Sequence, residues 1–175
     1  TKRNDIPMCG IPYHAAQTYI GRLLRAGKKI AICEQISLPA EGKGIAERDI
    51  VEIITPGTIL DEDYLEADTN NYLVSIGISG KFLSFSYIDT STSDFYATAF
   101  SISNDLEKLK EELERIQPKE ILVQESLLES NTNVARVLKE YKGRILNRYP
   151  DWYFDQEESR KKLLKQFNVL NLKGF

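Results

Sequence analysis

The sequence is poor in the side chains that build cross-links and metal sites. Its 175 residues include two cysteines, Cys9 and Cys33, and one histidine, His14. Two cysteines are too few for a disulfide framework, and they do not form a CxxC pair. Because these side chains could supply only a few metal ligands at irregular spacing, we expect no zinc site.

A long apolar run is also missing. No segment approaches the roughly 18 apolar residues that cross a bilayer, and the segment from Thr1 to Asp5 leads into no signal-peptide core. We therefore expect a cytoplasmic protein without membrane contact. The pattern GxxxxGKS/T is absent as well, so we expect no ATP to bind here through a P-loop.

A strong net charge is the third absence. The chain carries a net charge of −3, and its 42% hydrophobic and 28% charged residues are typical of a folded globular protein. Residues 1–55 hold eight basic and six acidic residues, whereas residues 56–175 hold fifteen and twenty. The first part is mildly basic, but too weakly to decide for or against binding to nucleic acid.

The first part of the chain predicts a small mixed α/β unit. Apolar residues recur at helical spacing from Tyr13 to Ala26, and β-prone runs follow at 29–36 and 49–55. Pro56-Gly57 suits a type II turn. The acidic stretch 60–68 has little apolar content, so we place the domain boundary there.

The second part predicts a mixed five-stranded sheet with helices. Strands are expected at 71–79, 82–89, 94–101, 120–124 and 144–149. Helices are expected from a capping box at Asn104 to a stop before Pro118, at 132–141 and at 155–167. Three meandering strands followed by alternating helices and strands indicate the ribonuclease-H-like topology.

A ribonuclease-H-like fold raises the alternative of a metal-dependent nuclease. Such an enzyme needs a carboxylate in the middle of its first strand, and the run 72–78 has none. The carboxylates of Asp89 and Asp94 surround hydroxyl residues, and we interpret them as turn-stabilising groups. The basic residues between Arg160 and Lys165 are expected to form a solvated helix end rather than a DNA-binding patch.

One loop points to a binding role. Pro7, Gly10 and Pro12 shape a rigid loop that presents Met8 just before a predicted helix. Helix N-termini bind phosphate, and apolar side chains can enter a minor groove. The alternative is that Met8 fills a small core, and physical reasoning alone favours this second interpretation.

Several motifs resemble the MutS family of DNA mismatch-repair proteins. In chain order they are Ile6-Pro7-Met8-Cys9-Gly10-Ile11-Pro12-Tyr13-His14-Ala15, Ala31-Ile32-Cys33-Glu34-Gln35, Glu47-Arg48, Ile54-Thr55-Pro56-Gly57-Thr58 and Asp89-Thr90-Ser91-Thr92. By this resemblance, residues 1–55 form the later part of mismatch-recognition domain I. Residues 56–175 form connector domain II, with its ribonuclease-H-like fold.

The resemblance also implies partners and a site. Met8 would contact mismatched duplex DNA, with Pro7 and Gly10 shaping its loop, while Glu52 puts a phosphate contact on its strand in doubt. The parent would be a nucleoid-associated homodimer that binds ATP and Mg²⁺ outside this chain and signals to MutL. The chain itself would have no catalytic site, cofactor or metal, because the family's Phe-x-Glu wedge and ATPase lie elsewhere. A pure protein-binding module is the remaining alternative.

Overall fold

A computed structural model describes most of the chain as two compact units, Thr1–Asn71 and Tyr72–Phe175, which are described separately below. The described residues are 2–3, 6–37, 46–60, 64, 69–102, 106–130, 132–141 and 145–174. None of the helices in these ranges combines the length and apolar character that crossing a bilayer requires.

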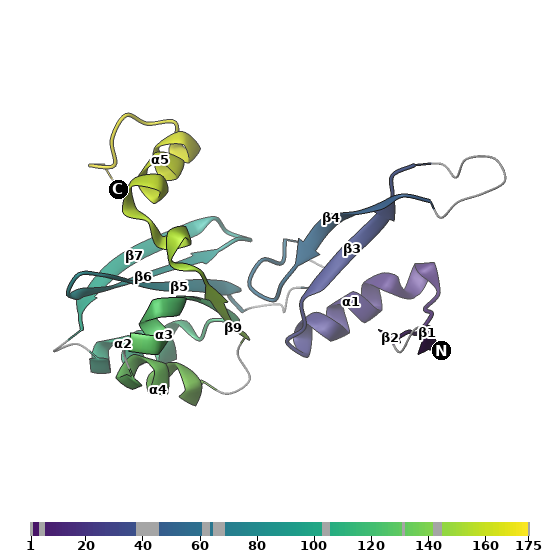
Figure 1. The fold of residues 1–175 in the computed structure, drawn as a ribbon, viewed down its shortest axis with the longest axis horizontal. Coiled ribbons are helices and arrows are strands. Elements are labelled where there is room, and N and C mark those ends of the chain that lie inside the picture. Colours follow the sequence, from purple (N-terminus) through teal and green to yellow (C-terminus); the bar gives the residue numbers. More distant parts are fainter. Residues whose placement is uncertain are drawn as a thin grey trace. The chain divides into compact units, whose positions relative to one another are not determined.

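A single long helix and a β-hairpin form most of the first unit (Figure 1). Short strands β1 (Lys2–Arg3) and β2 (Ile6–Pro7) pair with each other, and the 3₁₀ turn η1 (Tyr13–Ala15) leads into α1 (Ala16–Arg25). The predicted helix at 13–26 is therefore confirmed. Gly27 ends it with a positive φ of 73°, a conformation that glycine adopts without strain.

The hairpin pairs β3 (Ile30–Gln35) with β4 (Arg48–Ile54) in antiparallel register. The register shifts at Ile32 and Cys33, so Val51 is an extra residue, as in a β-bulge. On one face, Ile54 packs with Leu24, Ile59 and Tyr64 in a small core. The first unit thus continues through residues beyond 55, up to Asn71.

The turn after β4 differs from the expected type. The Thr58 amide donates to the Thr55 carbonyl at 3.0 Å, which closes a four-residue turn. Gly57 lacks the positive φ that a type II turn requires, so the prediction of that type was wrong. Instead, the Thr58 hydroxyl accepts from the Thr55 amide at 3.1 Å, and this side chain holds the turn.

The second unit is built on a five-stranded mixed sheet with the order β7-β6-β5-β8-β9. The strands are β5 (Tyr72–Ser79), β6 (Phe82–Asp89), β7 (Asp94–Ser101), β8 (Glu120–Gln124) and β9 (Ile145–Tyr149). The first three are antiparallel neighbours, and β5, β8 and β9 are parallel. This order confirms the predicted ribonuclease-H-like sheet.

Helices α2 (Leu106–Ile116), α3 (Glu125–Ser130) and α4 (Thr132–Glu140) lie on one side of this sheet (Figure 1). Val74 and Ile76 of β5 and Phe85 of β6 face them and are fully buried. The helices contribute Leu109, Leu113, Leu127 and Val137 to the same core. Below, we call this the helix face and the opposite side the open face.

Helix α5 (Gln156–Phe167) begins after the 3₁₀ turn η2 (Asp151–Phe154). Asp155 accepts a hydrogen bond from the Glu158 amide at 2.8 Å, which caps the helix. The basic residues Arg160, Lys161, Lys162 and Lys165 are exposed, as expected for a solvated helix end. The predicted cap at Asn104 lies outside the described residues.

Candidate nucleic-acid interface and the connector surface

The loop that carries Met8 is exposed in the first unit. Met8 follows the short β1–β2 pair and has 54% of its surface exposed, while Pro7 and Gly10 are exposed as well. Met8 is also absent from the small core around Leu24. Its side chain is therefore exposed on the surface and does not fill that core.

Gly10 and the prolines play unequal parts in this loop. Pro12 precedes η1 in extended backbone (φ −62°, ψ 139°), and its carbonyl accepts from the Ala15 amide at 3.0 Å. Gly10 has no positive φ, and a Cβ added there would meet nothing within 4 Å. The loop conformation therefore depends on proline restriction and does not require glycine at position 10.

The structure separates the cations of the first unit. Lys28 and Lys29 are exposed and precede β3, whereas Arg48 pairs with Gln35 at the far end of the hairpin. Because strands rise about 3.4 Å per residue, these two ends are roughly 17 Å apart. Figure 1 shows α1 and β3 running in opposite directions, so α1 begins toward the end of the unit at which β3 ends and β4 begins.

Glu52 is exposed, and it lies on the hairpin face that carries the small core. It pairs with Ile32 and lines a cavity of about 350 Å³ together with Thr58 and Tyr64. On the other hairpin face, Ile50 and Ile53 are exposed. The Glu52 carboxylate therefore lies on the side of the small core, away from that exposed apolar face.

In the described part of the second unit, no carboxylates converge where a ribonuclease-H-type enzyme would need them. Both sheet residues at the middle of β5 that face the helices, Val74 and Ile76, are apolar. Asp89 pairs with Tyr72 and faces the helix side, whereas Glu120 pairs with Leu73 and faces the open side. Within the described residues, no group of three or more His, Cys, Asp or Glu side chains could hold a metal ion.

The two buried carboxylates serve local structure. Asp89, only 1% exposed, accepts from the Ser91 amide at 3.0 Å and the Ser91 hydroxyl at 2.6 Å. Thr92 donates to Asp94 at 2.7 Å in the same turn, which confirms the turn interpretation of this segment. Glu120, 2% exposed, accepts a hydrogen bond from the Asn147 amide group.

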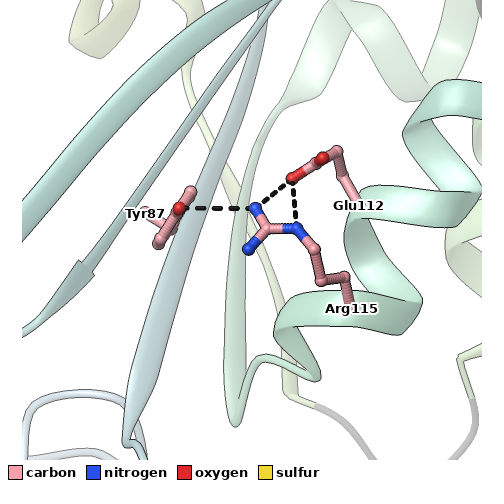
Figure 2. Close-up of polar contacts among 3 residues, drawn as sticks. All are labelled: Tyr87, Glu112 and Arg115. Atoms are coloured by element: carbon pink, nitrogen blue, oxygen red, sulfur yellow. Dashed lines mark hydrogen bonds and ion pairs between the residues drawn. The ribbon is translucent and has the colours of Figure 1, made fainter.

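A polar cluster that the sequence analysis missed joins the end of α2 to β6. Figure 2 shows the Arg115 guanidinium between the Glu112 carboxylate, 3.2 Å from Nε, and the Tyr87 hydroxyl, 3.4 Å from Nη2. Hydrogen bonds from Glu112 and then Tyr87 raise the pKa of Arg115 above its usual range. Burial, followed by the nearby Tyr87, raises the pKa of Tyr72, whose ring meets Tyr87 edge-on. Because these contacts join the end of α2 to β6, the side chains of Tyr87, Glu112 and Arg115 act as a structural clamp.

A groove of about 830 Å³ lies between the open face and α5. Its floor carries serine hydroxyls from two strands, Ser75, Ser84 and Ser86, and its rim carries Ser159 and Arg160. The Phe154 ring packs over Gly77 in the same region: a Cβ on Gly77 would lie 2.6 Å from Phe154 Cδ1. The signal in the sequence was the alternation of serine with apolar residues along β5 and β6.

At the end of β8, a side chain extends the ladder. The Gln124 Oε1 atom accepts from the Ile78 amide at 2.8 Å, beyond the last backbone pair Ile76 and Val123. Asp151 Oδ1 accepts from the Ser126 amide at 3.1 Å at the start of α3. Hydrogen bonds from the Ser126 side chain and backbone lower the pKa of Asp151.

Comparison with known proteins matches both units to one family. Residues 1–63 match the model of MutS domain I, and residues 71–175 match MutS domain II. DNA mismatch repair protein MutS of Treponema denticola is 47% identical over 185 residues, which cover 100% of this chain and 21% of the relative. MutS of Borreliella burgdorferi (strain ZS7) is 45% identical over 179 residues, covering 98% and 19%.

A solved structure of another protein aligns with part of the chain. T. thermophilus RuvC in complex with Holliday junction substrate aligns with a TM-score of 0.42 at 12% identity, covering 58% of this chain and 81% of that one. The chain spans about a fifth of the length of the curated relatives named above. From the two domain matches and the identities over its whole length, the chain belongs to the MutS family.

Proposed function

We propose that this chain is a DNA-contacting and signal-relaying part of a DNA mismatch-repair protein. The observation that carries the proposal is the match to MutS domains I and II in one continuous chain. The first unit helps to position the mismatch-recognition domain on duplex DNA. The second relays the bound state to an ATPase region and to MutL.

The exposed Met8 loop supports the DNA-contacting part of this proposal. An apolar side chain that reaches the minor groove gains contacts where stacking is weak, while cations supply the phosphate contacts. Met8 and Arg48 are both exposed in the first unit and offer both kinds of contact. Pro7 and Gly10 flank Met8 and would lie near the DNA, with the restricted backbone of Pro7 holding the loop.

The remaining roles belong to the parent protein. We propose that ATP and Mg²⁺ bind outside this chain, since the sequence contains no P-loop pattern. The parent acts as a homodimer in the cytoplasm, associated with the nucleoid. The second unit supplies a folded connector, and its clamp of Tyr87, Glu112 and Arg115 stabilises the position of α2.

Fluorescence anisotropy with matched and G·T-containing duplexes tests the DNA contact. We expect weak binding of the non-specific kind, on the order of 10⁻⁴ to 10⁻⁶ M, with little preference for the mismatch. Met8→Ala should weaken binding at every salt concentration, and Arg48→Gln should reduce the salt slope by about 1. Leu170→Ala, which removes an apolar side chain that is 96% exposed in the second unit, is the control.

If Met8→Ala binds DNA as tightly as the unsubstituted chain, the DNA contact lies elsewhere.

The relay is tested separately by surface plasmon resonance with immobilised MutL of the same organism. Met8→Ala should bind MutL like the parent chain, because Met8 lies in the first unit. If the unsubstituted chain does not bind MutL, the proposed relay is contradicted, and the proposed DNA contact is unaffected.

A further inference from the structure

Strand β7 is an edge strand without the usual protection. It pairs with β6 on one side, and within the described residues no strand pairs with its other side. Its eight residues, Asp94–Ser101, contain one charge at the first position and no proline or lysine. The β6–β7 register runs without a bulge. Natural edge strands usually carry charges, prolines or bulges that prevent pairing with another chain.

The backbone of β7 presents alternate residues to this free edge. The Ile102 amide donates to the Lys81 carbonyl at 3.1 Å, so even-numbered residues of this segment turn their backbone groups toward β6. Hydrogen bonding in antiparallel pairs alternates along the strand, so Ala97 and Ala99 turn their amides and carbonyls outward. Their side chains are small and exposed, and they leave these groups accessible.

We propose that β7 is a docking edge for a second copy of this chain, which pairs antiparallel with it about a two-fold axis. Outward amides and carbonyls are satisfied most fully by another extended backbone. A second copy fits because the strand is self-complementary in the register centred on Thr98. Ala97 then pairs with Ala99 of the second copy, and Tyr96 lies opposite Phe100 of the second copy.

The same register places no two like charges opposite each other. Asp94, the one charged residue of β7, falls opposite the uncharged Ile102 of the second copy. Aromatic pairs across antiparallel strands stabilise pairing, whereas like charges directly opposite each other destabilise it.

Sedimentation velocity from low to high micromolar concentration tests the proposal on the full chain. We expect a concentration-dependent dimer. Ala97→Pro removes an outward amide but leaves the ladder to β6, and Ala97→Lys places a charge on the edge. Each should raise the dimer dissociation constant by roughly tenfold or more, which corresponds to the loss of about 1.4 kcal/mol.

Ser84→Lys is the matched control, because Ser84 is exposed on the same face but on β6, away from the edge. It should dimerise like the parent chain. Circular dichroism establishes that each variant is folded. A parent chain that stays monomeric, or a dimer that persists in both Ala97 variants, would overturn the proposal.

Cross-linking tests the register directly. Thr98 would face its own copy as a non-hydrogen-bonded pair, with Cα atoms about 4.5 Å apart, which is within disulfide range. In a background with Cys9→Ser and Cys33→Ser, Thr98→Cys should form a covalent dimer on oxidation, whereas Ser84→Cys should stay monomeric. Equal cross-linking of both variants would contradict pairing through β7.

Discussion

The ring of Phe154 occupies the space in which a side chain at position 77 would begin. A Cβ on Gly77 would lie 2.6 Å from Phe154 Cδ1 and 3.1 Å from the Ser84 hydroxyl. The glycine is therefore a packing requirement: it lets η2 approach the open face of the sheet. Its backbone has no positive φ, so conformation is not the reason for glycine at this position.

Gly77→Ala should destabilise the second unit by about 1–3 kcal/mol, the usual cost of overpacking. Chemical denaturation measures the change. Gly10→Ala, where an added Cβ meets nothing within 4 Å, should change stability by less than about 0.5 kcal/mol. Phe154→Leu should recover part of the loss when combined with Gly77→Ala. Full stability of Gly77→Ala alone would show that Phe154 does not pack there.

Asp151 should make stability depend on acid pH. Hydrogen bonds from Ser126 lower the folded-state pKa of Asp151. The ionised Asp151 therefore adds to the free energy of unfolding at pH values above its unfolded-state pKa of about 3.9. This stabilisation is lost as the pH falls through the folded-state pKa. Asp151→Asn keeps an oxygen acceptor for the Ser126 amide and removes the charge. Urea denaturation should show a less stable variant at neutral pH and equal stabilities in strong acid. A difference that persists in strong acid would contradict a charge effect.

The cap of α5 gives a third prediction. Asp155→Ala removes the acceptor of the Glu158 amide, and loss of such a cap costs about 0.5–2 kcal/mol. Asp155→Asn should retain most of that stability, because asparagine caps as well as aspartate. Thermal unfolding followed by circular dichroism distinguishes the two variants. Equal losses in both would show that the charge, not the hydrogen bond, is the stabilising feature.

We expect no cleavage of nucleic acid dependent on Mg²⁺ or Mn²⁺. The middle of β5 presents Val74 and Ile76 to the helix face, and the buried Asp89 and Glu120 lie on opposite faces of the sheet. Incubation of labelled RNA–DNA hybrid and duplex DNA with each metal measures this. Activity that survives repurification and disappears in Asp89→Asn would contradict the expectation.

Elements with strong periodicity could be predicted from the sequence, and those that depend on tertiary contacts could not. The alternation along β5, β6 and β7 and the stripe of α2 gave nearly correct bounds. Helix α3 was missed because its six residues follow directly on β8 and its start is held by Asp151, a residue distant in sequence. The short η2 turn was missed for the same reason.

The position of Met8 could not be predicted from the residues alone. Physical reasoning favoured a Met8 that fills a small core, and this preference was wrong because the side chain is 54% exposed. At Gly10 an added Cβ would meet nothing within 4 Å, so packing does not require a glycine there. The clamp of Tyr87, Glu112 and Arg115 joins a strand to a helix across distant positions, so no local pattern indicates it. The edge of β7 became visible only once the strand order was known.

The hydrogen bond from Ile78 to Gln124 makes a side chain substitute for a strand. Strand β5 continues to Ser79 after β8 has turned into α3, and the Gln124 carboxamide stands where the next main-chain carbonyl would have been. The residue at position 124 therefore needs a neutral hydrogen-bond acceptor more than it needs a particular side-chain volume. A leucine of similar size would fill the space and leave a part-buried amide without its acceptor, and a glutamate would bring a charge into a site that is 7% exposed. Strand β8 can therefore end at Gln124, because the side-chain amide of this residue accepts the hydrogen bond that a further β8 carbonyl would have accepted from β5.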